Sequence, residues 1–243
     1  MLFRSRGNIL FADSYIDLVA IDISKIDKPV EINRIENVFP EIVPEGDRWY
    51  PYAMVDKSKG VIVDWKVKTI TEDVEPGNNW GGWIYREKMT FLAASDGAAN
   101  WSAGAGTAGS MARFMLNDKY LHLIAHPWML KTVDVEKAEK MSIVDSINVS
   151  RNMETLFLLG GKMFVGTTTG MLIYDVTDAT KPRQISHYDH ITACDPVVAD
   201  ENYAYVTLRT GTRCSNGQNL LEVIDISSIT NPYLVKSYPM YNP

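Results

Sequence analysis

The chain has 243 residues, of which 46% are hydrophobic and 22% charged, a composition typical of globular rather than disordered proteins. The formal net charge of −6 and the absence of any Lys/Arg cluster argue against a nucleic-acid partner. No run approaches 18 apolar residues, so we expect no transmembrane segment. The first residues also lack the apolar segment and cleavage site of a signal peptide.

Residues 8–35 hold the first copy of a motif that recurs along the chain. Three segments rich in β-branched and aromatic residues, NILFADSY, DLVAIDIS and VEINRI, predict three strands. The middle strand ends on Asp22, and Ser24 and Pro29 follow it. Because no convincing strand precedes residue 8, we expect these residues to form a partial four-stranded unit.

Residues 36–109 interrupt the repeat. The segment at 59–75 predicts two strands, so a degenerate copy is expected, followed by an insertion rich in Gly, Ala, Asn and Trp. Gly104, Gly106 and Gly109 fit the dinucleotide pattern G-x-G-x-x-G, but they follow a polar loop and precede an expected strand rather than a helix. We therefore expect no dinucleotide site and no other cofactor.

Three complete copies follow, each with four expected strands, at residues 110–150, 151–192 and 193–240. The aspartate after the third strand recurs at intervals of 41 and 50 residues, as Asp134, Asp175 and Asp225. The polar loop at 209–219 accounts for the longer interval. A period of about 40–45 residues is that of four-stranded propeller blades. The sequence therefore predicts one all-β domain over residues 1–243, a partial β-propeller.

An array of three and a half blades leaves an apolar sheet face uncovered at its ends. A closed propeller removes such faces by joining its last blade to its first. We therefore expect the chain to be a fragment of a longer protein, or to be completed by another subunit.

The segments LVAID, LKTVD, LIYD and LEVID resemble the LVIVD-repeat family of bacterial surface proteins. GSMARF, CDPVV and YAYVTLR are similar to typical segments of its Bacteroidetes-type members. The resemblance implies a propeller with more blades and export to the cell surface or periplasm. It also implies a lipid anchor on an N-terminal cysteine, which would lie outside this chain. It implies no agreed enzymatic activity and no catalytic residues.

The four repeated aspartates could be metal ligands or structural residues. Each follows a strand and precedes a loop that usually contains Ser or Thr, which is the position of a side chain that caps a turn. We interpret Asp22, Asp134, Asp175 and Asp225 as structural and expect no metal site.

Charged residues recur at the start of the innermost strands. When the blades are aligned on the start of the second strand, Arg113, Glu154 and Asp195 fall at or within one residue of the same position. Innermost strands line the central channel of a propeller, so these groups are expected near its mouth. Two interpretations stay open: a site for a small polar ligand or ion, or a network in which Arg113 pairs with the acids.

His190 and Cys194 lie close to Asp195, but their spacing matches no strong zinc signature. Cys194 and Cys214 flank adjacent strands of one blade, so in an exported protein we favour a disulfide over free thiols or a metal site. In the insertion, Trp80, Trp83 and Trp101 either contact a sugar or protein partner or pack the insertion against a blade.

No nucleophile, metal or cofactor signature is present in the sequence. This favours a non-catalytic binding or scaffold propeller at the cell envelope, whose partner is a protein or a glycan. The alternative is a hydrolase or lyase acting on a carbohydrate, with Glu154 and Asp195 as general acid and base.

Overall fold

A computed structural model of the chain describes residues 3–40, 60, 62, 64–69, 113–190, 196–208 and 219–241. The chain divides into two units, Met1–Phe39 with Gly106–Pro243, and Pro40–Ala105. In the second unit, residues 60, 62 and 64–69 lie in no strand. The other residues of the two strands expected at 59–75 lie outside the described part of the chain, so these strands stay a prediction.

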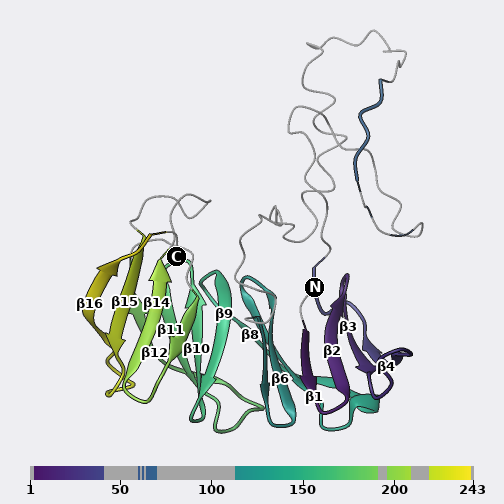
Figure 1. Ribbon diagram of the computed structural model, residues 1–243, viewed down its shortest axis with the longest axis horizontal. Coiled ribbons are helices and arrows are strands. Elements are labelled where there is room, and N and C mark those ends of the chain that lie inside the picture. The colour runs from purple at the N-terminus through teal and green to yellow at the C-terminus, as the bar shows by residue number, and fades with distance from the viewer. Residues whose placement is uncertain are drawn as a thin grey trace, which may run out of the picture. The chain divides into compact units, whose positions relative to one another are not determined.

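The first unit consists of four antiparallel sheets, each made of four consecutive strands (Figure 1). The first sheet contains β1 (Phe3–Arg6), β2 (Ile9–Ser14), β3 (Asp17–Asp22) and β4 (Val30–Ile35). The second contains β5 (Phe114–Asn117), β6 (Tyr120–His126), β7 (Met129–Asp134), the 3-10 helix η4 (Ala138–Lys140) and β8 (Ser142–Asn148). The third contains β9 (Met153–Leu159), β10 (Lys162–Thr167), β11 (Gly170–Asp175) and β12 (Arg183–Asp189). The fourth contains β13 (Val197–Ala199), β14 (Tyr203–Leu208), β15 (Leu220–Asp225) and β16 (Tyr233–Pro239).

Strand β1 completes the first sheet, so the expectation of a partial unit at 8–35 is wrong. Phe3 pairs with Ala12, and Arg6 pairs with Ile9. The strand has no apolar inward face, because its arginines are half-buried while Phe3 is 39% exposed. Arg6 instead donates hydrogen bonds to backbone carbonyls of the second sheet, among them that of Glu136 at 3.0 Å. Backbone acceptors therefore accommodate a charge at a position where the sequence pattern requires an apolar residue.

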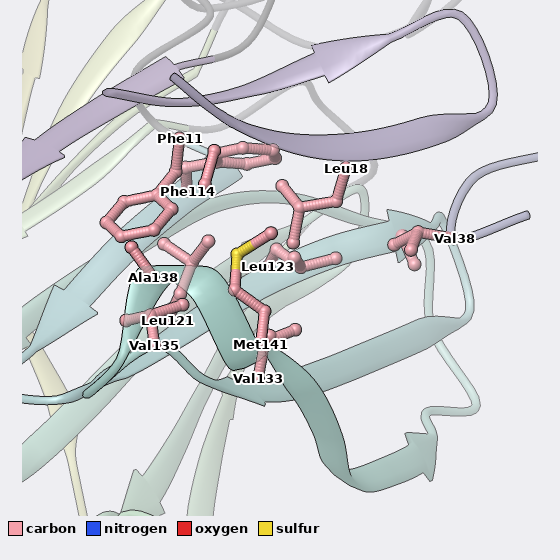
Figure 2. Packing of buried hydrophobic residues seen from close by; sticks show 12 residues of the cluster. Phe11, Leu18, Val38, Phe114, Leu121, Leu123, Val133, Val135, Ala138 and Met141 are labelled. Carbon is pink, nitrogen blue, oxygen red and sulfur yellow. The ribbon is translucent and has the colours of Figure 1, made fainter. Parts of the chain in front are cut away.

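Successive sheets pack on one another through buried apolar clusters. Between the first two sheets, Phe11 and Leu18 face Phe114, Leu121 and Leu123 (Figure 2). The first strands of neighbouring sheets are in contact, β1 with β5, β5 with β9 and β9 with β13. The last strand of each sheet is exposed or half-buried at every position except Ser186. This order of inner and outer strands is that of propeller blades, and the fold is an all-β partial propeller.

One turn geometry recurs in all four sheets. The third strand ends on the repeated aspartate, whose register partner begins the second strand. The next backbone N–H donates to the carbonyl before the second strand at 2.8–2.9 Å, from Ile23, Val135, Val176 and Ile226. The second sheet keeps this geometry although Glu136 and Met141 replace the usual Ser/Thr and Pro, because these bonds are made by the backbone. No helix in the described parts of the chain is long and apolar enough to cross a membrane.

Candidate functional site

The strands of the first unit end at two opposite ends of the sheets. We call one the aspartate end, because the third strands finish there on Asp22, Asp134, Asp175 and Asp225. We call the other the Arg113 end, because Arg113 immediately precedes β5 there and His126 finishes β6.

At the aspartate end, each repeated carboxylate holds a turn. Its Oδ1 accepts a hydrogen bond at 2.8–2.9 Å from the backbone N–H two residues on, in Ser24, Glu136, Thr177 and Ser227. The second oxygen of Asp175 accepts from Lys162 Nζ at 2.9 Å, and that of Asp225 accepts from the Tyr233 hydroxyl at 3.1 Å. Hydrogen bonds from Thr177 lower the pKa of Asp175, and those from Ser227 lower the pKa of Asp225. The interpretation of these aspartates as turn-capping residues is confirmed.

At the Arg113 end, a buried guanidinium interacts with carboxylates of both neighbouring sheets. Arg113 is 8% exposed, and burial lowers its pKa to about 10. The negative charges of Glu154, on β9, and Asp13, on β2, oppose that decrease. The structure thus brings Arg113 and Glu154 within electrostatic range, together with Asp13, which the sequence analysis did not single out. Asp195 lies outside the described residues.

An exposed aromatic side chain borders these charges. The Trp128 ring lies 4.4 Å from the His126 ring, and Trp128 is 39% exposed. Burial, followed by the charge of Arg113, lowers the pKa of His126 and so favours the neutral form of its ring. The N–H of Met153 donates to the carbonyl of Pro127 at 2.7 Å, which attaches this turn to the start of β9. We refer to Asp13, Arg113, His126, Trp128 and Glu154 as the Arg113 cluster.

The repeat alignment contained a signal for the missed members of this cluster. His126 ends the second strand and Trp128 lies in the turn to the third strand, which the alignment on Tyr120 places at the same end as Arg113. Residue type did not reveal them, because the equivalent turns of the other sheets contain no Trp.

His190 follows β12, at the junction of the third and fourth sheets. Its ring lies 6.2 Å from that of Tyr188. The hydroxyl of Tyr188 donates a 3.1 Å hydrogen bond to Oε2 of Glu222, a fourth-sheet carboxylate that is 6% exposed. The residues of the Arg113 cluster come from the first three sheets, whereas His190 lies beside Tyr188 at the boundary of the third and fourth sheets.

The remaining predicted site residues lie outside the described residues. They are Trp80, Trp83, Trp101, Cys194 and Cys214. The aromatic contacts and the disulfide therefore stay predictions. Within the described residues, no three His, Cys, Asp or Glu side chains are grouped so as to hold a metal ion.

His122 belongs to the core. It is 0% exposed, and its Nδ1 lies 3.0 Å from the hydroxyl of Thr132, its partner on β7. Burial lowers the pKa of His122 to about 4. The neutral ring therefore occupies a position between two sheets that Phe11 and Phe164 fill elsewhere in the repeat.

Residues 192–239 match the family model of the LVIVD repeat. The matched residues coincide with the fourth sheet, β13–β16, so the matched segment corresponds to one four-stranded sheet. The turn hydrogen bonds of that sheet recur in the other three, which relates all four sheets to the same structural unit.

Two solved structures are similar to this chain at low identity. The N-terminal domain of Nup159 is 7% identical, covers 96% of this chain and 42% of its own, and has a TM-score of 0.40. The other is a complex of an S. cerevisiae Dbp5 variant with Nup159, a Gle1 variant, IP6 and ADP. Its matching chain is 8% identical, the match covers 52% of this chain and 30% of that chain, and the TM-score is 0.35. The chain thus spans less than half the length of either, and the fold assignment rests on its own sheet topology. No curated protein matches the chain.

Proposed function

We propose that this chain is a non-catalytic binding or scaffold module of a cell-envelope protein, and that it engages its partner at the Arg113 end. The lengths of the connections carry the proposal. At the aspartate end, the third strand is joined to the fourth by seven residues in every sheet, at 23–29, 135–141, 176–182 and 226–232. At the Arg113 end the connections vary, and the two longest are 36–113 and 209–219. Binding residues are concentrated in variable loops held by a regular scaffold.

The chemistry of the Arg113 end supports a protein or glycan partner. Trp128 presents an exposed indole beside charged groups, and such amphipathic rings anchor proteins and stack on sugars. We propose that Trp80, Trp83 and Trp101, which lie outside the described residues, also contact the partner.

The electrostatic interaction between Arg113 and Glu154 argues against the carbohydrate-cleaving alternative. A general acid must carry a proton before it donates one, and glycosidases raise the pKa of that carboxyl. Glu154 instead interacts electrostatically with the buried guanidinium of Arg113, and its negative charge raises the pKa of that group. Glu154 therefore fits the structural network in which Arg113 is held by acids better than it fits a catalytic pair with Asp195.

The proposed location rests on the LVIVD repeat and on the resemblance to bacterial surface proteins. We infer that the chain is exported, that it is part of a longer lipid-anchored protein, and that Cys194 and Cys214 are oxidised to a disulfide. Sequencing of the complete source gene, together with detection of the protein in fractions of the cells, tests the location directly.

Binding measurements with matched variants test the proposed surface. The full chain is applied to a printed array of bacterial and host glycans and to immobilised envelope proteins, and each hit is titrated. Trp128→Ala removes an exposed side chain at the Arg113 end, whereas Ile26→Ala removes one, 88% exposed, at the aspartate end. We expect at least about tenfold weaker binding for Trp128→Ala, since aromatic anchors dominate interfaces, and no change for Ile26→Ala.

The opposite pattern, loss of binding in Ile26→Ala alone, contradicts the proposed surface. A panel of nitrophenyl glycosides is assayed in parallel. Turnover that disappears in Glu154→Gln contradicts the non-catalytic role.

A further inference from the structure

His122 lies at the boundary of the second and third sheets. It alternates with Ile124 along β6, so the two side chains are on the same face of the second sheet. Ile124 packs in the apolar cluster that joins this face to Met163 and Leu172 of the third sheet. Since His122 is 0% exposed, its imidazole is enclosed between these two sheets.

This boundary accommodates only the neutral form of the ring. Nδ1 of His122 lies 3.0 Å from the hydroxyl of Thr132. Nε2 is buried and has no hydrogen-bond partner among the described residues. A protonated imidazole carries a charge, and both of its nitrogens are donors. Because burying such a group is costly, the ring takes up a proton only when the boundary opens to water.

Charged and titratable side chains approach the boundary from both sheets. From the second sheet and its connections they are Arg113, Tyr120, His126, Asp134 and Asp145, and from the third sheet they are Glu154, Tyr174 and His187. Asp145 pairs with Thr132, which pairs with His122, so Asp145 lies two strand spacings, or about 10 Å, from the strand of His122. Burial lowers the pKa of His122 to about 4, and no charge among the described residues offsets that decrease.

The same boundary passes through the Arg113 cluster. Arg113 and Trp128 belong to the connections of the second sheet, and Glu154 belongs to β9 of the third. The N–H of Met153, which begins β9, donates to the carbonyl of Pro127 at 2.7 Å, next to Trp128. Separation of the two sheets breaks this hydrogen bond and moves Glu154 away from Arg113.

We propose that His122 makes the boundary of the second and third sheets an acid-sensitive joint, which keeps the Arg113 cluster assembled at neutral pH and opens it in acid. The opened form binds a proton with the ordinary histidine pKa of about 6.5, and the closed form with a pKa of about 4. The joint is therefore closed most firmly above about pH 6.5, and this stabilisation is lost as the pH falls toward 4. Between pH 7.5 and pH 5 the opened fraction rises about 30-fold.

The joint has a consequence for binding, which rests on the proposed role of the Arg113 end. A partner that contacts Trp128 together with groups of the third sheet is held at neutral pH and released in an acidic environment. Buried histidines act in this way when their protonation favours a second arrangement of packed elements. The joint itself does not depend on the identity of the partner.

Amide hydrogen exchange of the full chain, followed by NMR at pH 7.5 and pH 5, tests the joint without a partner. The Met153 amide crosses the boundary of the second and third sheets. The Val197 amide donates to Thr155 Oγ1 at 3.4 Å and crosses the boundary of the third and fourth. Rates are corrected for intrinsic exchange at each pH. Dilute urea separates partial opening from global unfolding, because global unfolding exposes more surface and responds more strongly.

We expect the protection of Met153 against partial opening to fall about 10- to 30-fold at pH 5, and that of Val197 to stay the same. His122→Phe should remove the change at Met153, since phenylalanine occupies the equivalent buried positions of the first and third sheets. His187→Gln, at an exposed histidine, should keep it.

Equal protection of Met153 at the two pH values would overturn the proposal, and this wild-type measurement needs no variant to fold. A change of the same size at Val197, or a change at Met153 that persists in His122→Phe, would also overturn it. So would loss of the change in His126→Gln, which would assign the effect to the Arg113 end itself. A response of Met153 in a chain that binds no component of the arrays supports the joint and contradicts only the proposed function.

Discussion

The hydroxyl of Tyr188 and the carboxylate of Glu222 form a 3.1 Å hydrogen bond across the boundary between the third and fourth sheets. Glu222 is 6% exposed, and a buried carboxylate that loses a donor is left with an uncompensated polar atom. Tyr188→Phe should therefore lower the free energy of unfolding by about 1–3 kcal/mol, as measured by urea denaturation at pH 7. The control is Tyr241→Phe, which removes the hydroxyl of a tyrosine that is 94% exposed and should change stability by less than about 0.5 kcal/mol. Equal effects of the two substitutions would show that the Tyr188–Glu222 bond does not stabilise the sheet boundary.

The buried His122 makes stability depend on pH. Its folded pKa of about 4 lies below the ordinary value of about 6.5, so the unfolded chain binds a proton between these values and the folded chain does not. Stability is therefore present in full above about pH 6.5 and falls as the pH is lowered toward 4, by up to about 3 kcal/mol.

His122→Phe should remove this dependence, because phenylalanine fills the same position in the first and third sheets. The measurement is the free energy of unfolding at pH 7.5 and at pH 5. His187→Gln, at an exposed histidine, should leave the dependence as it is in the wild type. A His122→Phe chain that loses as much stability at pH 5 as the wild type would exclude His122 as its source.

Two substitutions of one turn-capping aspartate, Asp175, are expected to lower stability by different amounts. Asp175→Asn keeps an oxygen that can accept from the Thr177 N–H, whereas Asp175→Ala removes the acceptor for Thr177 and for Lys162. Asp175→Ala should therefore be the more destabilising of the two in urea denaturation. Because hydrogen bonds lower its folded pKa, Asp175 stabilises the fold above the ordinary aspartate pKa of about 4, and this contribution is lost as the pH falls below that value. Identical stabilities of the two variants at pH 7 would mean that the side chain does not cap the turn.

The proposed disulfide is tested by intact-mass spectrometry. After export to an oxidising compartment, Cys194 and Cys214 should resist alkylation until a reductant is added, and the mass should then increase by two alkyl groups. Loss of the disulfide in Cys214→Ser should lower the urea concentration at the midpoint of unfolding, since the crosslink restricts the unfolded chain. Two alkylated cysteines without reductant would exclude the disulfide.

The sequence allowed the repeat to be predicted because its signal is local. An aspartate after a β-branched run and a hydroxyl residue two positions later already contain both partners of the turn, and the structure pairs Asp22 with Ser24, Asp175 with Thr177 and Asp225 with Ser227. The strand at 3–6 escaped prediction because its half-buried side chains are arginines, and the partners of Arg6 are backbone carbonyls more than 100 residues away. Hydrophobic periodicity carries no information about such acceptors.

The candidate site was predictable only in part, for a related reason. Arg113 and Glu154 emerged because the repeat alignment superposes them, so their convergence follows from the periodicity. Asp13 and Trp128 occupy positions at which the other sheets carry unrelated residue types, so no pattern distinguished them. Their association with Arg113 depends on how neighbouring sheets pack, which one sequence does not specify.

The central claim is that one four-stranded unit is built four times, and amide hydrogen exchange tests it most directly. In every sheet the N–H after the repeated aspartate donates to the carbonyl before the second strand, at Ile23, Val135, Val176 and Ile226. We predict that all four amides exchange slowly and with similar protection, because each closes the same turn. Exchange of Ile23 or Val135 at the rate of an unstructured peptide, while Ile226 in the LVIVD match stays protected, would contradict the account.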